Sequence, residues 1–202
     1  LFNDDQRFDI KSKVNMNTDT LDSQLLKNKI KQLDFMKIDV QGSELNVLKG
    51  STNSLKNIIG LEIECEISEL YNNQPLLGNI LEFLSSKEFH LFDLKRYYWK
   101  RKNAKINNDK KGQLIFVDAL FFKQPEMLII EFENDYLKLL KGYYLYLFYG
   151  YTDLAQIILN YLNKKNLIDQ YTMTDLSKNI FNVDKVSYVV PNFPGKKFLK
   201  KI

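Results

Sequence analysis

The sequence has almost none of the residues that build metal centres and disulfides. Its 202 residues include one cysteine, Cys65, and one histidine, His90. A single cysteine excludes an internal disulfide, and with a single histidine it also excludes zinc sites built from Cys or His. No clear site for another divalent metal is visible, so we expect no metal, although Asp39 and Glu64 can contribute two oxygens to one. The lack of a disulfide framework favours a reducing, cytoplasmic location.

Long apolar runs and phosphate-binding glycine motifs are also missing. No apolar run approaches the roughly 18 residues of a membrane helix, and no signal peptide is visible, so no membrane span is predicted. Neither a GxGxxG sequence nor a Walker loop occurs. The chain starts at Leu1 rather than at a methionine, and we therefore expect an upstream segment in the parent protein.

The charge is too even to indicate a nucleic-acid binder. Its net value is +4, and the lysines are spread along the chain, whereas nucleic-acid binders gather basic residues on one face. One segment, 96–102, mixes cations with aromatic residues and can stack on bases or sugar rings. A solvated hairpin arm explains the same composition more simply, and we predict no nucleic-acid partner.

The first part of the chain alternates between strand and helix patterns. Residues 35–40 are apolar on both faces, as in a central parallel strand, and 58–67 alternate with period two. Strand patterns follow at 90–94 and 114–123, and helical spacing occurs at 21–33, after Gly42 and after Pro75. This order predicts an α/β, doubly wound sheet. Because no helix separates the last two strands, we expect them to pair antiparallel.

The pattern changes after Pro125. Residues 136–150 and 153–163 have helical spacing and are joined by a Gly-Tyr-Thr turn, which predicts a helical hairpin. A short basic tail follows near residue 200. The sequence therefore divides into residues 1–125 and 126–202, the second part being a helical extension that offers a surface for protein contact.

Asp39 is the first candidate for chemistry. It ends a buried strand and precedes a glycine turn and a helix, and open α/β sheets bind ligands at that end of their strands. The alternative is an aspartate that caps the following turn. Glu44 lies in the first turn of the next helix, where the helix dipole favours an acid regardless of function.

Three more acids, Glu62, Glu64 and Glu66, lie on one face of the second strand. On an interior strand these carboxylates repel each other, so at least one needs a partner such as Lys37. The one nearest the crevice can act as a base or bind substrate, and periodicity does not say which it is. Asp118, isolated among apolar residues, needs a buried partner or a place at the end of the sheet.

Several blocks in order make the chain resemble the FkbM family of S-adenosylmethionine-dependent methyltransferases. They are Thr20-Leu-Asp22, the run from Asp34 to Gly50 that reads DFMKIDVQGSELNVLKG, Glu64 with Leu70-Tyr71 and Gln74-Pro75-Leu76, and Asp118-Ala-Leu-Phe121. Together they span residues 20–123. The resemblance implies a class I methyltransferase-like (Rossmann-like) sheet of seven strands with an antiparallel last strand. It also implies S-adenosylmethionine as cofactor and methyl transfer to an oxygen of a sugar, glycan or natural product.

The resemblance also assigns roles at the crevice. Asp39, Gln41, Gly42 and Glu44 match its motif, and Glu64 is the glutamate that matches. Asp39 and Glu64 are then the expected catalytic pair, Asp39 and Gly42 the expected cofactor contacts, and Gln41, Glu44 and Tyr71 the expected contacts of a small-molecule or glycan acceptor.

One part of the family pattern is absent. Residues 1–20 contain neither the acidic, glycine-rich cofactor loop nor the acid after the second strand, so the chain resembles the C-terminal portion of the domain and is expected to bind cofactor poorly without them. Cys65, Glu66, Glu69 and Glu88 also depart from the family pattern. The alternative function is a non-catalytic module, derived from a methyltransferase half, that binds a protein or glycan.

Overall fold

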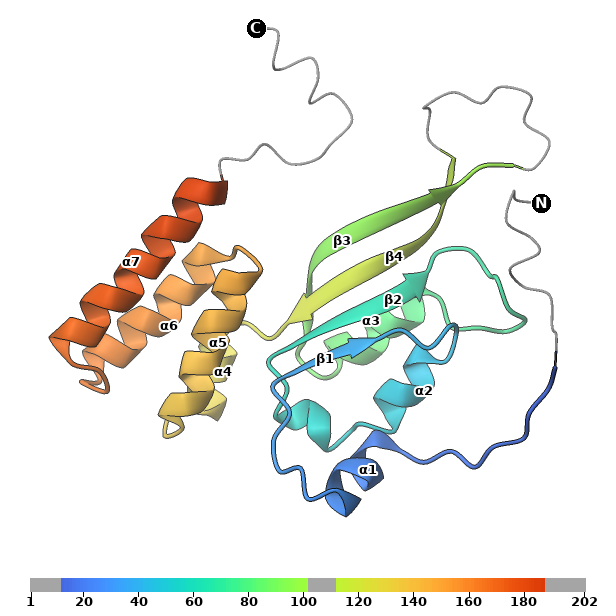
Figure 1. The fold of residues 1–202 in the computed structure, drawn as a ribbon, viewed down its shortest axis with the longest axis horizontal. Coiled ribbons are helices and arrows are strands. Elements are labelled where there is room, and N and C mark those ends of the chain that lie inside the picture. The colour runs from blue at the N-terminus through green and yellow to red at the C-terminus, as the bar shows by residue number, and fades with distance from the viewer. Residues whose placement is uncertain (1–11, 102–111, 188–202) are drawn as a thin grey trace, which may run out of the picture. The chain divides into compact units, whose positions relative to one another are not determined.

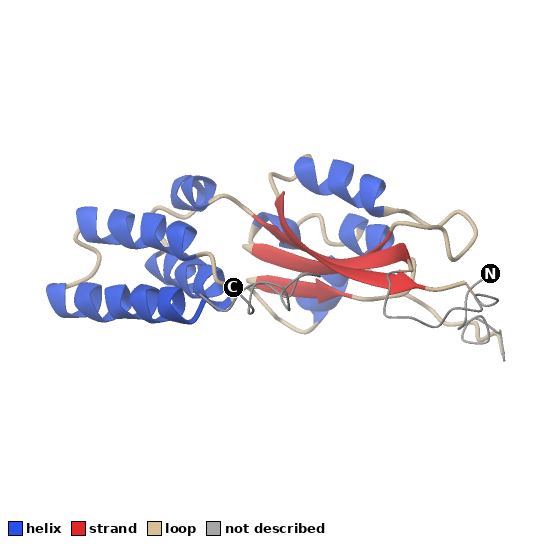
Figure 2. Ribbon diagram, turned by 90° about the horizontal axis from the view of Figure 1, so that it is seen from above, coloured by secondary structure: helices blue, strands red, loops and turns tan. Residues whose placement is uncertain are grey.

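The computed structural model describes residues 12–101 and 112–187. Its contacts divide the chain into two compact units, Leu1–Lys123 and Gln124–Ile202 (Figure 1). The strands lie in the first unit, and the described part of the second is helical (Figure 2).

The described residues of the first unit form a mixed sheet of four strands. They are β1 (Phe35–Ile38), β2 (Gly60–Glu66), β3 (His90–Trp99) and β4 (Gln113–Phe122), in the order β1-β2-β4-β3. β1 and β2 are parallel, and β4 is antiparallel to both β2 and β3. The antiparallel pairing expected for the last two strands is therefore present, and it places the chain's fourth strand beside its second.

The core of this unit lies between one face of the sheet and the helices α2 (Glu44–Lys49) and α3 (Leu77–Ser85). Alternate residues of β1, β2 and β4 point into it, which follows from the period-two geometry of strands. Cys65 is 1% exposed there. The residues of β2 that alternate with these core residues are Glu62, Glu64 and Glu66. The period-two geometry therefore places the three acids on the other face of the sheet.

The first helix, α1 (Leu21–Lys27), is shorter than its apolar spacing predicted. It ends at Asn28, and Lys29 then takes a φ of +55°. Leu26 and Ile30 are 81% and 50% exposed. Since no residue of α1 is fully buried, little packing energy is available to extend it to residue 33. Residues 13–18 form neither a helix nor a strand.

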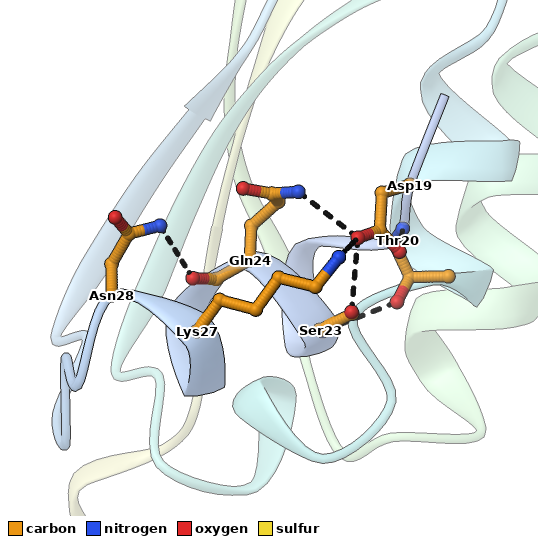
Figure 3. Close-up of polar contacts among 6 residues, drawn as sticks. All are labelled: Asp19, Thr20, Ser23, Gln24, Lys27 and Asn28. Carbon is orange, nitrogen blue, oxygen red and sulfur yellow. Dashed lines mark hydrogen bonds and ion pairs between the residues drawn. The ribbon is translucent and has the colours of Figure 1, made fainter. Parts of the chain in front are cut away.

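Asp19 organises the start of α1 (Figure 3). Its carboxylate accepts hydrogen bonds from Thr20 N, Ser23 Oγ and Gln24 Nε2 at 2.8, 3.0 and 3.0 Å, and it pairs with Lys27. Thr20 caps the helix by accepting from Ser23 N at 3.2 Å, as expected.

Asp22 fastens α1 to the chain that leaves α2. Its carboxylate accepts hydrogen bonds from Asn53 N and Ser54 N at 2.8 and 2.9 Å and from the Ser54 hydroxyl, and its own N–H donates to the Gly50 carbonyl at 3.1 Å. Gly50 itself ends α2 with a φ of −79°, outside the left-handed region.

The second unit contains α4 (Pro125–Glu131), α5 (Tyr136–Phe148), α6 (Thr152–Lys164) and α7 (Gln170–Ser187). α5 and α6 are the predicted hairpin, and α6 also packs against α4 and α7. The buried Tyr143 on α5 donates its hydroxyl to the Leu176 carbonyl on α7 at 2.5 Å. The sequence patterns missed α4 and α7. No helix within the described ranges combines the length and apolar character required to cross a membrane.

Candidate functional site

The turn between β1 and α2 is built around Glu44. This side chain is 2% exposed, and its carboxylate accepts hydrogen bonds from Val40 N at 3.1 Å and from Gly42 N at 3.0 and 3.1 Å. A carboxylate that accepts backbone N–H groups at a helix N-terminus is strongly favoured there. These bonds support a structural role for Glu44, and its contact with a substrate stays a prediction.

Gly42 has a backbone conformation that only glycine adopts easily. Its φ is +102°, and a Cβ at this position would lie 3.2 Å from Tyr71 Cδ2. The preceding residue, Gln41, is also left-handed, with a φ of +56°. The chain therefore reverses sharply after Asp39 and brings the turn against the Tyr71 ring.

Gln41 joins the two predicted catalytic acids. Its amide nitrogen Nε2 donates to Glu64 Oε1 at 3.0 Å and to Asp39 Oδ1 at 3.3 Å. Ile38 on β1 pairs with Ile63 on β2, so Asp39 and Glu64 follow side by side at the carboxyl ends of parallel strands. Asp39 and Gln41 are exposed and Glu64 is half-buried. The structure thus brings together three residues that the sequence placed at the site.

Tyr71 reaches the site from the segment that follows β2. Its side chain is 38% exposed and lies beside Gly42. Gln74 holds this segment in place, because its Oε1 accepts hydrogen bonds from Leu70 N and Tyr71 N, both at 2.6 Å. Sequence reasoning listed Gln74 only as part of the Gln-Pro-Leu block and did not recognise it as the residue that positions Tyr71.

The three glutamates of β2 have different surroundings. Glu62 Oε1 accepts from Lys37 Nζ at 2.7 Å, so Lys37 is the cationic partner that the acidic face required, and it neutralises Glu62 rather than Glu64. Glu66 is 2% exposed, and its Oε2, like Gln74 Nε2, is buried without a hydrogen-bond partner among the described residues. Glu64 is left facing Asp39 and Gln41.

The pKa of Glu64 is raised to about 7. Burial is the main cause, and the nearby carboxylates of Asp39, Glu66, Asp118 and Glu44 add to it by repelling its negative charge. Burial, followed by the charge of Glu44, also raises the pKa of Glu66. A carboxyl group that titrates near neutral pH can take up a proton under physiological conditions.

The remaining candidates lie elsewhere. Within residues 12–101 and 112–187, no three His, Cys, Asp or Glu side chains form a group suited to a metal ion. His90 lies on β3 and is exposed. Most of the basic-aromatic segment 96–102 belongs to β3 and the residues just after it, whereas Lys102 falls outside the described residues.

The model of the methyltransferase FkbM domain family matches residues 3–91. This segment contains the β1–α2 turn, Glu64 and Tyr71, and it confirms the family resemblance there. β4, with Asp118, lies beyond the matched residues. No similar protein was found among curated proteins, and no similar structure among solved ones.

Proposed function

We propose that this protein is an S-adenosylmethionine-dependent methyltransferase that methylates a hydroxyl of a sugar, glycan or natural product. The observation that carries the proposal is the bridge from Gln41 to Asp39 and Glu64, at 3.3 and 3.0 Å, at residues that lie in the segment matched by the family. On this proposal the four strands are the C-terminal part of a class I methyltransferase sheet, and β4 is its antiparallel last strand.

The acids supply the chemistry that oxygen methylation needs from the protein. A hydroxyl becomes a better nucleophile as its proton leaves, and a positioned carboxylate within hydrogen-bond reach can accept that proton. Glu64, with its pKa raised to about 7, is the base that takes this proton. Asp39 orients the hydroxyl, and Gln41 holds the two acids at a fixed separation.

The donor set at the site fits the cofactor's charge. S-adenosylmethionine supplies an electrophilic methyl group on a positively charged sulfonium and also carries an ammonium group, and both suit a site rich in carboxylates. Asp39 is exposed and would hold the cationic part. The Val40 and Gly42 N–H groups already donate to Glu44, so Gly42 contributes a close backbone approach rather than a hydrogen bond.

The acceptor would lie against Tyr71, Gln41 and Glu64. The Tyr71 ring offers an apolar face suited to the C–H side of a sugar, and the amide and carboxylate groups suit its hydroxyls. Close positioning of the hydroxyl and the methyl group supplies much of the acceleration in such a reaction.

The test is calorimetric titration of S-adenosylmethionine into the complete product of the gene, followed by methyl transfer to a panel of sugars and glycans. We expect binding and transfer in the natural protein. In Asp39→Asn we expect transfer to fall severely, by roughly 10²–10⁴-fold, with an unchanged circular dichroism spectrum. The absence of any cofactor binding would refute the proposal, and wild-type transfer by Asp39→Asn would refute the role of Asp39.

A second candidate is a non-catalytic module that binds a protein or glycan. Exposed aromatic side chains on the helices of the second unit favour it, because Phe148, Tyr171 and Phe181 are 81%, 84% and 58% exposed. Retention of a glycan or protein partner by a protein that binds no S-adenosylmethionine would support this candidate over the enzyme.

A further inference from the structure

Asp118 extends the pair of acids into a row across the sheet. In the antiparallel register of β2 and β4, Asp118 lies directly opposite Glu64, and Lys95 of β3 lies opposite Asp118. Side chains directly opposite each other have Cβ atoms roughly 4.5–5.5 Å apart. Asp39, Glu64, Asp118 and Lys95 therefore follow one another on four adjacent strands or their ends.

Tyr97 holds Asp118 in this row. Its hydroxyl donates to Asp118 Oδ2 at 2.6 Å, whereas Lys95 Nζ lies 3.6 Å from the same oxygen. The Asp118 side chain is 14% exposed and that of Lys95 is 73% exposed, so water screens the lysine charge. The Tyr97 ring stacks on Phe116, with centroids 4.4 Å apart and planes 10° apart, which fixes the direction of its hydroxyl.

We propose that Asp118 is a positioning residue of the methyltransferase: the Tyr97 hydroxyl holds its carboxylate directly opposite Glu64, where it adds to the negative charge around the acid that takes the acceptor's proton. This inference rests on the proposed function. It adds Asp118 of β4 and Tyr97 of β3 to a site that otherwise consists of the β1–α2 turn, Glu64 and Tyr71. A hydrogen bond to the ionised form of a carboxyl favours that form, and a neighbouring negative charge increases the proton affinity of the next carboxyl.

Charged groups surround Glu64 on every side, so the contribution of Asp118 has to be isolated. They are Lys37 and Asp39 from β1 and its end, Glu44 from α2, Glu62 and Glu66 from β2 itself, Asp118 from β4 and Lys95 from β3. Gln41 adds a neutral donor. Only substitution of Asp118 removes the charge directly opposite Glu64 and leaves the β1–α2 turn intact.

The experiment follows the Glu64 carboxyl carbon by ¹³C nuclear magnetic resonance as the pH is varied. In the natural protein we expect a midpoint near 7, and in Asp118→Asn a midpoint at lower pH, because one of the repelling charges is gone. Asp93→Asn is the matched control, because Asp93 is an exposed aspartate of β3 opposite Leu120, and it should leave the midpoint unchanged. An unchanged Glu64 midpoint in folded Asp118→Asn would overturn the proposal.

A second variant keeps the test decisive. Asp118→Ser removes the same charge with a smaller side chain and should also lower the Glu64 midpoint. An unchanged midpoint in folded Asp118→Ser would overturn the proposal even if Asp118→Asn failed to fold. The titrations need no methyl transfer, so a protein that shows the expected midpoints but no transfer would disprove the proposed function and leave the electrostatic coupling intact. If the protein transfers methyl groups, the pH at which the transfer rate is half-maximal should be lower in Asp118→Asn, as the Glu64 midpoint is.

Discussion

Two acids in the first unit have opposite surroundings. Asp19, at the start of α1, accepts hydrogen bonds from Lys27, Ser23 and Thr20, which lower its pKa to about 2. Glu64, near the end of β2, is partly buried, and this burial together with the surrounding carboxylates raises its pKa to about 7. Both are carboxyl groups of one small unit, and their surroundings separate their pKa values by several units.

The contrast separates a structural acid from one that can exchange a proton. An aspartate surrounded by donors stays ionised at every physiological pH and fastens a helix end. A glutamate surrounded by other acids changes its charge near neutral pH, which disfavours the folded state but prepares the group to act as a base. A cluster of perturbed acids is therefore better placed for chemistry than a well-paired one.

The largest expected effect tests the catalytic side of this contrast. Glu64→Gln removes the base and should reduce methyl transfer by roughly 10²–10⁴-fold, measured with radiolabelled S-adenosylmethionine. Glu62→Gln is the control on the same face, because Glu62 is paired with Lys37, and it should retain most of the activity. Equal losses of methyl transfer in Glu64→Gln and Glu62→Gln would contradict the assignment of Glu64 as the base.

The second prediction concerns the turn after Asp39, which positions Asp39 and Gln41 beside Glu64. Gly42→Ala forces a Cβ into a backbone with φ of +102° and to within 3.2 Å of Tyr71. It should lower the free energy of unfolding by about 1–3 kcal/mol, measured by urea denaturation. Gly78 on α3 has no atom within 4 Å of an added Cβ, so Gly78→Ala should be neutral or stabilising. An unchanged free energy of unfolding in Gly42→Ala would show that the turn does not require glycine at this position.

The third prediction concerns stability and pH at Glu64. Its folded pKa lies above the usual 4.5, so its deprotonation weakens the fold, and the free energy of unfolding should fall as the pH rises from about 4.5 to about 7. Glu64→Gln should remove this loss and be more stable than the natural protein at pH 8, by about 1 kcal/mol. At pH 4 the two should be alike. Destabilisation by Glu64→Gln at pH 8 would contradict the raised pKa.

The smallest effect is expected at Asp19, where stability should rise with pH instead of falling as it does for Glu64. Its folded pKa of about 2 lies below the usual 3.8, so its contribution is present above pH 3.8 and is lost as the pH falls toward 2. Asp19→Asn should lower the melting temperature slightly at pH 7 and have no effect at pH 2. A variant as stable as the natural protein at pH 7 would show that the cluster in Figure 3 adds nothing to stability.

The sequence predicted the local elements better than the contacts between them. β1, the glycine turn and α2 follow from residues close in the chain, and so does the hairpin of α5 and α6. The bridge of Gln41 to Glu64 joins residues 23 positions apart, and periodicity carries no information on such a contact. The resemblance placed Gln41 and Glu64 at one site without showing that they touch.

Other features depended on register or packing. Tyr97 meets Asp118 only because β3 and β4 pair antiparallel in one register, with irregularities between Leu91 and Asp93 and between Tyr97 and Tyr98. A one-residue slip would turn Asp118 to the other face. α7 is weakly amphipathic, so its own sequence pattern did not predict it. The hydrogen bond from Tyr143 to Leu176 depends on how α5 and α7 pack together, which the sequence pattern does not show.

The contact of Asp22 with residues 50–54 has a consequence for β1. The chain enters β1 from α1 and leaves it through the turn and α2, and Asp22 joins the beginning of that path to its end. Non-covalent bonds thus close the segment from residue 22 to residue 54 into a ring that contains β1, Asp39 and Gln41. Within such a ring, a shift of Asp39 along β2 would disturb both the pairing of β1 with β2 and the hydrogen bonds of Asp22.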